Sequence, residues 1–475
     1  MARIVSRLKT VSPDVVAAFL LASTIFTMVL GSGSTPEIVG PGRKLRWIFL
    51  FALAVYACWL AVRRGQQDSS PLLVWSLGLA GWLAGLGFVS TAWSVDPRLT
   101  FGRAGSFALL MTAAGALAFA VRFRPQLRSR LLLGVLAGSV GAALGGIGMY
   151  IFEVDRAVQP ASGLYPARFR GLGQNPNTVA MLLGLTVPLS LWALSRARGR
   201  TQRTLAGGAF LLLMGSITAS GSRGALVAAL GGGLIFALFG VGSRRERLAL
   251  SLSIVISSAA AAGIMQIPQP LPHSLVTVPN PHGPGTIQEP APVAGAPLPG
   301  GGPNYGGRLQ DELYRVQPAE RSLFTSSGRL KAWYTAIQQA DARPILGFGF
   351  GTENKVFVSR VYGFEGTYVE NSFIGFYLQL GAVGLLSIVA LSGLIAAAAV
   401  SAVRHGGAEG QIAALVGAAV AGFVLMLFQS YMYSVGNVAT VTFWTACMLL
   451  VSGVGVARPM PVFQLRRRRD AVAPA

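Results

Sequence analysis

The stretch Tyr368-Val-Glu-Asn-Ser-Phe-Ile-Gly-Phe-Tyr-Leu-Gln-Leu-Gly381 places a carboxylate, Glu370, at the start of an apolar run that continues to Val403. A polar connection of about one hundred residues precedes this stretch. A charge at the edge of a membrane segment is costly, so an ionisable residue found there is a candidate functional residue. The stretch therefore indicates a membrane-spanning fold and a first place to look for its chemistry.

Composition indicates the same class. The chain has 475 residues, of which 52% are hydrophobic and only 12% are charged, whereas soluble proteins average about 25% charged residues. The net charge of +22 comes mostly from arginines in short clusters between apolar runs. This distribution is typical of cytoplasmic loops and argues against nucleic-acid binding. The predicted fold class is an all-α polytopic transmembrane helix bundle.

Twelve apolar runs are candidates for spanning a bilayer, which takes about 20 residues with a range of roughly 17–25. They cover residues 14–31, 46–62, 71–92, 104–121, 131–152, 177–195, 204–219, 224–241, 248–266, 382–403, 411–432 and 437–457. The first run could also be a signal peptide, but its length and the lack of a small-x-small site favour a retained span. Cys58 and Cys447 both fall inside apolar runs, and a disulfide between them is left open.

Basic residues predict the orientation. With the N-terminus inside, the cytoplasmic loops hold 22 Lys and Arg and the short outer loops hold nine. The positive-inside rule then places both termini in the cytoplasm. The basic tail 458–475 is most simply an anchor near anionic lipid.

The connection 267–370 is then extracytoplasmic and separates spans 1–9, in residues 1–266, from spans 10–12, in residues 371–457. Its part 268–303 is Pro- and Gly-rich and cannot build a core. His273 and His282 lie there as solvated side chains, and no metal site of ordinary ligand spacing is visible in the sequence.

Two further elements are expected near the end of this connection. Leu330, Trp333, Tyr334 and Ile337 recur at helical spacing and predict an amphipathic helix, with Ser327 as its cap, lying across the outer face of the bundle. Residues 371–381, interrupted by glycine, predict a short half-inserted helix before the tenth span. Between the two elements, Pro344-Ile-Leu-Gly-Phe-Gly-Phe-Gly351 would permit close approach of backbones.

Three arginines on the outer side are candidates for holding an anionic substrate. Arg170 precedes the sixth span, Arg223 lies in a tight Gly-flanked turn, and Arg329 begins the amphipathic helix. Each also has a simpler explanation without a substrate. Arg170 would be an interfacial arginine, Arg223 a snorkelling arginine, and Arg329 a solvated charge at a helix start. Asn175 or Asn177, on either side of Pro176, predicts a helix start.

The motifs resemble those of the O-antigen ligase and polymerase family, over about residues 170–384. They are Asn175-Pro-Asn177, Ser222-Arg-Gly-Ala225, Gly328-Arg-Leu-Lys-Ala-Trp333, Pro344-Ile-Leu-Gly-Phe-Gly-Phe-Gly351, Asn371 and Gln379-Leu-Gly-Ala-Val-Gly384. The resemblance implies a polytopic glycosyltransferase in the bacterial inner membrane with its active site on the outer face. The donor would be a glycan linked to polyprenyl diphosphate, and the acceptor a lipid A core for a ligase or another repeat unit for a polymerase.

The resemblance also implies residue roles. Arg223 and Arg329 match the arginines that hold the donor diphosphate, a task that two guanidiniums can perform without a metal ion or another cofactor. Arg170, Asn175 and Asn371 are further site candidates. Ligases of this family carry a histidine as the presumed base, and here Glu370 stands in its place, with ten residues between it and Gly381.

Glu370 can act as the base if its pKa lies near the working pH. Burial would raise the pKa of this carboxyl group, and nearby arginines would lower it. An interfacial carboxylate that merely pairs with an arginine is the alternative. The missing histidine leaves a polymerase, or a transferase for another surface glycan, open beside a ligase.

Two other functional classes remain. A transporter or lipid-linked oligosaccharide flippase also suits twelve spans, but the halves show no repeat and the spans carry almost no charge. A lipid-binding or scaffold role is the third possibility.

Overall fold

A computed structural model of the chain describes residues 12–63, 70–160, 167–266, 329–357, 368–404 and 410–454. Within these ranges the chain is all-α, apart from a small antiparallel ribbon of β1 (Val158–Gln159) and β2 (Arg168–Phe169). The predicted fold class is confirmed. The segment 268–303, both loop histidines, Ser327 and the basic tail lie outside the described residues.

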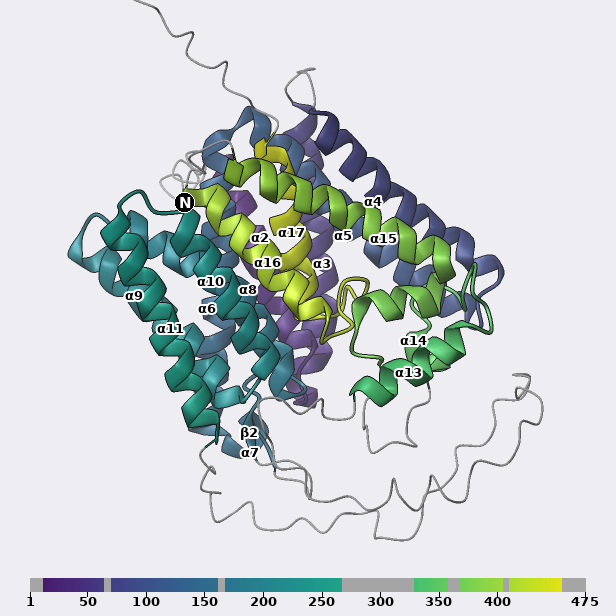
Figure 1. The fold of residues 1–475 in the computed structure, drawn as a ribbon. Coiled ribbons are helices and arrows are strands. Elements are labelled where there is room, and N and C mark those ends of the chain that lie inside the picture. The colour runs from purple at the N-terminus through teal and green to yellow at the C-terminus, as the bar shows by residue number, and fades with distance from the viewer. Residues whose placement is uncertain are drawn as a thin grey trace, which may run out of the picture.

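Twelve long helices coincide with the twelve predicted apolar runs in the described part of the chain (Figure 1). They are α2 (Pro13–Gly31), α3 (Pro36–Val62), α4 (Pro71–Val89), α5 (Pro97–Phe123), α6 (Pro125–Phe152), α8 (Pro176–Arg196), α9 (Arg200–Ser220), α10 (Arg223–Phe239), α11 (Arg244–Gln266), α15 (Ser372–Arg404), α16 (Gly410–Met426) and α17 (Val438–Val454). The shorter helices are η1 (Ser90–Ala92), α7 (Val154–Ala157), α13 (Arg329–Ala340) and α14 (Glu353–Val356).

Eight of the described helices are long and apolar enough to cross a membrane. Helices α10, α16 and α17 are also apolar but have 17 residues each. The chain is therefore a multi-pass membrane protein, and the count of twelve spans stays a prediction.

Proline sets where many of the helices begin. Six of them, α2 to α6 and α8, have proline at the first helical position. Proline loses no intrahelical hydrogen bond there, and its fixed φ already suits the helix. Polar caps precede several of these prolines, because a side-chain oxygen can accept from the free amides of the first turn. The capping side chains are Ser12, Ser70, Asp96 and Asn175.

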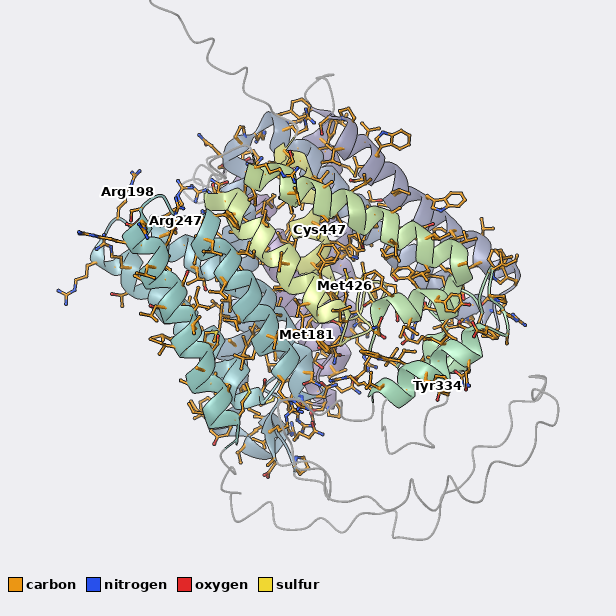
Figure 2. All side chains as sticks on the ribbon, viewed as in Figure 1. Met181, Arg198, Arg247, Tyr334, Met426 and Cys447 are labelled. Atoms are coloured by element: carbon orange, nitrogen blue, oxygen red, sulfur yellow. The ribbon has the colours of Figure 1, made fainter. Side chains whose placement is uncertain are left out.

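The core of the bundle is centred on α8 and α17. Every residue of α17 from Val438 to Ser452 is buried, and this helix contacts α5, α8, α15 and α16. Figure 1 shows α16 and α17 in the middle of the bundle, with α9 and α11 at one edge and α4 at the other. Figure 2 shows Arg198 and Arg247 together at one end, whereas Tyr334 of α13 lies toward the opposite end. Short helices α13, α14 and α7 lie at that opposite end, which also carries the site described below.

Helix α15 is broken at Gly381, whose φ of 61° and ψ of −158° are not helical. The first piece, 372–380, is the short helix that the glycine pattern predicts, although its depth in the membrane is untested. The segment 344–351 crosses the break and pairs with it. The amides of Ala382 and Val383 donate to Pro344 and Ile345 at 2.7 and 3.3 Å, and the amides of Phe348 and Gly349 donate to Leu378 and Gln379 at 3.1 and 2.8 Å.

Glycine is required on both sides of this crossing. A Cβ at Gly381 would lie 2.2 Å from the carbonyl carbon of Ile345, and one at Gly347 would lie 2.5 Å from the carbonyl oxygen of Gln379. Both residues also have positive φ. The expected close approach of backbones is therefore found here.

Helix α13 forms where the apolar spacing predicts it, but a different face packs against the protein. Leu330, Tyr334 and Ile337 are exposed, and only Trp333 of the predicted apolar face is partly buried. The residues buried against α15 are Ala332, Ala336 and Ala340. Alanine allows the two helices to approach closely. The sequence-based prediction relied on the large apolar side chains and therefore chose the wrong face.

Gly381→Ala should destabilise the folded protein. Positive φ costs a residue with a side chain about 1–3 kcal/mol, and the added Cβ would also collide with Ile345. The melting temperature in detergent micelles should therefore fall by several degrees. The control is Gly393→Ala in the same helix, where a Cβ would meet open space. Equal melting temperatures for the two variants would contradict this role for Gly381.

Candidate functional site

Glu370 occupies a strained turn immediately before α15. Its φ is +55°, and it is the only residue other than glycine with positive φ in the described part of the chain. Such a conformation costs about 1–3 kcal/mol and persists only where the surroundings enforce it. Strain of this kind clusters at functional sites, so the geometry singles out the residue that the sequence also singles out.

Arg329 contacts this carboxylate directly. Its Nε donates to Glu370 Oε2 at 2.8 Å, and each side chain keeps less than a quarter of its surface exposed. Burial raises the pKa of Glu370 above its usual range, while the charge and hydrogen bond of Arg329 act in the opposite sense. This contact runs through Nε of the guanidinium. A carboxylate with a raised pKa beside a cation is suited to accept a proton near an anionic group.

Asn371 has a structural task. Its Oδ1 accepts from the amides of Phe373 and Ile374 at 3.0 and 3.1 Å, which is the geometry of a helix N-cap. Its Nδ2 donates to the carbonyl of Leu427 at 3.4 Å. Asn371 thus fixes the start of α15 against the connection between α16 and α17.

Arg223 approaches the same connection from another side. It is the first residue of α10 and follows Gly221, whose φ of +60° ends α9. The next residue, Gly224, faces Phe428, since a Cβ there would lie 3.7 Å from the Cβ of Phe428. Ser372, two residues after Glu370, donates to the carbonyl of Gln429 at 2.7 Å. Helices α10 and α15 therefore begin against consecutive residues of one turn, which brings the backbones of Arg223 and Glu370 near that turn.

Arg170 and Asn175 are positioned by local contacts away from Glu370. Arg170 donates from Nε to the carbonyl of Arg156 at 2.9 Å and so ties β2 to α7, and burial lowers its pKa. Asn175 Oδ1 accepts from the amides of Asn177 and Thr178 at 2.9 and 3.1 Å, so the predicted helix start is confirmed as an N-cap. No recorded contact among the described residues joins either side chain to Glu370.

Two arginines that the sequence did not single out lie close to the turns of the site. Arg168 donates from Nε to the carbonyl of Ser220 at 2.7 Å, just before the turn that carries Arg223. The guanidinium of Arg46 on α3 lies beside Gly436, in the same connection that Asn371 contacts. Its Nε is buried and donates to no acceptor among the described residues. The alternation Arg168-Phe-Arg170 gave no reason to prefer Arg168, and Arg46 looked like one of three loop cations.

A fully buried carboxylate, Glu353, was missed altogether. Its Oε1 accepts from the amide of Val369 at 2.6 Å and from Ser430 Oγ at 2.8 Å, and its Oε2 accepts from the hydroxyl of Tyr433. Burial raises its pKa to about 7, against these three donors and the charge of Arg103. Helix α14 has four residues, which is too short for a periodic signal, so nothing in the sequence marked Glu353 as buried.

Two cavities lie at different ends of the bundle. One of about 420 Å³ opens between α6 and α9, with mostly apolar walls that include Ile147, Leu212 and Ala219. Arg168 lies at its edge, so the cavity reaches toward the turn that carries Arg223. A larger cavity of about 890 Å³ is lined by Arg196, Arg203 and Glu246. It lies at the end of the bundle that carries Arg198 and Arg247, whereas Tyr334 of α13 lies toward the opposite end (Figure 2).

Comparison with protein families identifies the central part of the chain. A family model described as O-antigen ligase matches residues 208–389, from α9 into α15. Residues 208–389 therefore form a domain similar to that of O-antigen ligases. The matched region of this domain includes Arg223, Arg329, Glu353 and Glu370, and excludes Arg170 and Asn175. A comparison with curated proteins finds no match.

Glu353 should make the folded protein less stable as pH rises. With a pKa of about 7 when folded and an ordinary value of 4.5 when unfolded, the native state holds more protons between these values. Stability is therefore greatest below about pH 4.5 and is lost up to about pH 7, by roughly 3 kcal/mol for this group. Glu353→Gln should flatten this part of the curve of melting temperature against pH.

The matched control for this measurement is Glu246→Gln, which removes an exposed carboxylate. Its curve should follow that of the unmodified protein. If Glu353→Gln gave the same curve as this control, the raised pKa would be wrong.

Proposed function

We propose that this O-antigen ligase family protein transfers a glycan from polyprenyl diphosphate to an acceptor hydroxyl at the outer face of the bacterial inner membrane. The family assignment supports a membrane glycosyltransferase of the ligase or polymerase type. The observation that carries the proposal is the pair formed by Arg329 and Glu370 at a strained turn in the matched region. This pair combines a base with a cation suited to phosphate.

The diphosphate would lie between Arg223 and Arg329. Guanidinium groups can bind phosphate oxygens through two parallel hydrogen bonds. Arg329 contacts Glu370 through Nε, and its terminal nitrogens would bind the phosphate. Arg46 would add a third positive charge beside Gly436, in the connection between α16 and α17. The cavity between α6 and α9 would accept part of the prenyl chain, because its walls are mostly apolar and it reaches toward the turn before Arg223.

The reaction would be a single displacement. Glu370 accepts the proton of the acceptor hydroxyl, and the acceptor oxygen forms a bond to the anomeric carbon. The bond from that carbon to the diphosphate oxygen breaks, and polyprenyl diphosphate leaves with the electron pair and the negative charge. Arg223 and Arg329 stabilise this charge as it develops. A single displacement inverts the anomeric centre.

Glu370→Gln should abolish most of the transfer while the protein still folds. The amide keeps the shape but cannot accept the proton, so turnover should fall by a factor of roughly 10²–10⁴, the usual contribution of a positioned base. The test expresses the variant in a deletion strain and analyses surface glycan and lipid-linked intermediates. Accumulated single repeats indicate a polymerase, and accumulated long lipid-linked chains indicate a ligase. Intermediates confined to the inner leaflet would contradict the proposal and indicate a flippase.

Arg223→Ala and Arg329→Ala should each weaken use of the lipid donor, as measured by transfer from a defined lipid-linked glycan in detergent. The lysine variants should recover little, since lysine cannot make the paired contact with phosphate. The matched control is Arg98→Ala, which removes an exposed arginine from the first turn of α5. Full activity of either alanine variant at the site would remove that residue from the diphosphate site.

A further inference from the structure

The strain at Glu370 needs a source, because the turn adopts a conformation that this residue avoids when unconstrained. Arg329 contacts only the end of the side chain. The constraint on the backbone comes from groups that hold the residues on either side of Glu370.

Glu353 and Ser430 hold the amides of the two residues that flank Glu370. Before Glu370, the amide of Val369 donates to Glu353 Oε1 at 2.6 Å. After it, the amide of Asn371 donates to Ser430 Oγ at 3.2 Å. The hydroxyl of Ser430 in turn donates to the same Oε1 atom at 2.8 Å. One carboxylate oxygen therefore fixes the amide on one side directly and the amide on the other side through a single hydroxyl.

Glu353 is itself held firmly. The hydroxyl of Tyr433 donates to its Oε2 atom, and Arg103 of α5 adds a favourable positive charge nearby. The backbone of α14 is also anchored, because the amide of Gly351 donates to Gln379 Oε1 on α15 at 2.5 Å. The position of Glu353 thus depends on the loop 344–351, which crosses the break in α15.

The hydrogen bond from Val369 to Glu353 also affects the position of Arg329. Val369 is fully buried in a small cluster with Phe357, Leu378 and the alanine face of α13. Since Arg329 is the first residue of α13, the position of Val369 affects both partners of the ion pair. Glu353 fixes Val369 and so sets the relative placement of the proposed base and the proposed phosphate ligand.

A direct chemical role for Glu353 does not fit its surroundings. The side chain is fully buried, and its two oxygens already accept three hydrogen bonds. An acceptor hydroxyl would have to displace one of these donors to reach it. The arrangement instead suits a group that acts through its neighbours.

We infer that Glu353 is a positioning residue, which clamps the turn Val369–Asn371 and presents Glu370 to the acceptor hydroxyl. This inference rests on the proposed role of Glu370. Misplacing a catalytic group by about 1 Å can cost on the order of 10²-fold in rate. Loss of the clamp should therefore lower turnover strongly while leaving the binding of the lipid donor nearly unchanged.

Two conservative variants separate shape from charge. Glu353→Gln keeps an oxygen at the position of Oε1, so both arms of the clamp survive, and its amide can donate to the oxygen of Tyr433. Glu353→Asp keeps the charge but is one methylene shorter and cannot reach both Val369 and Ser430. We expect Glu353→Gln to keep kcat within about threefold and Glu353→Asp to lose roughly 10- to 100-fold, with KM for the lipid donor within about twofold in both.

Hydrogen exchange provides a readout that does not depend on transfer. Peptides that cover residues 368–372 should stay protected in Glu353→Gln and lose protection in Glu353→Asp, as followed by mass spectrometry. Ser430→Ala removes only the arm to Asn371 and should give a smaller loss at the same peptides. Ser430→Ala also serves as the test variant if Glu353→Asp fails to fold.

The outcomes separate this inference from the proposed function. Unchanged protection and turnover in both Glu353→Asp and Ser430→Ala would overturn the clamp. So would a Glu353→Gln variant that is fully protected yet as inactive as Glu370→Gln, because Glu353 would then act chemically. Full activity of Glu370→Gln would refute the proposed base, while the exchange data would still show whether Glu353 holds the turn.

Discussion

A break in a buried helix leaves backbone amides and carbonyls without partners, and the structure depends on how these are satisfied. In α15 the groups at the break at Gly381 pair with the segment 344–351, which donates to the piece before the break and accepts from the piece after it. Inside a membrane protein such irregular backbone is tolerated only where protein covers it or where it lines a cavity. The crossing therefore fixes an irregular loop against a helix with four backbone hydrogen bonds.

Much of the site follows from this crossing. It ends at Gly351, whose amide is held by Gln379, and α14 begins two residues later with Glu353. Glu353 in turn holds the turn that carries Glu370, and Glu370 contacts Arg329. The break in α15 and the strained turn at its start are thus linked by a short series of hydrogen bonds, in which each group is placed by the one before it.

The sequence predicted the parts of this arrangement that have a strong local signal. Twelve apolar runs gave the long helices, and the glycine pattern gave both the short piece before Gly381 and the close approach at Gly347. Asn175 was recognisable as a cap because proline follows it. Glu370 stood out because it is a charge at the edge of an apolar run.

The parts that could not be predicted depend on contacts between distant segments. Glu353 lies in a helix of four residues, and its burial depends on Ser430 and Tyr433, which are about eighty positions away in the chain. The packed face of α13 could not be recognised either, because alanine gives no strong hydrophobic signal beside Leu330 and Tyr334. Arg46 looked like an ordinary loop cation until its neighbour, Gly436, was known.

Under the proposed function, the ion pair has a consequence for the order of events. Arg329 lowers the pKa of Glu370, whereas burial raises it, and burial has the larger effect. A diphosphate bound by Arg329 would bring negative charge next to this pair and offset the positive charge that Glu370 experiences. The pKa of Glu370 would then rise further, so the carboxylate would become a stronger base once the donor is in place. Deprotonation of the acceptor would thus be favoured only when the diphosphate leaving group is bound. The reason is that the Arg329 guanidinium contacts the base and is also proposed to hold the diphosphate.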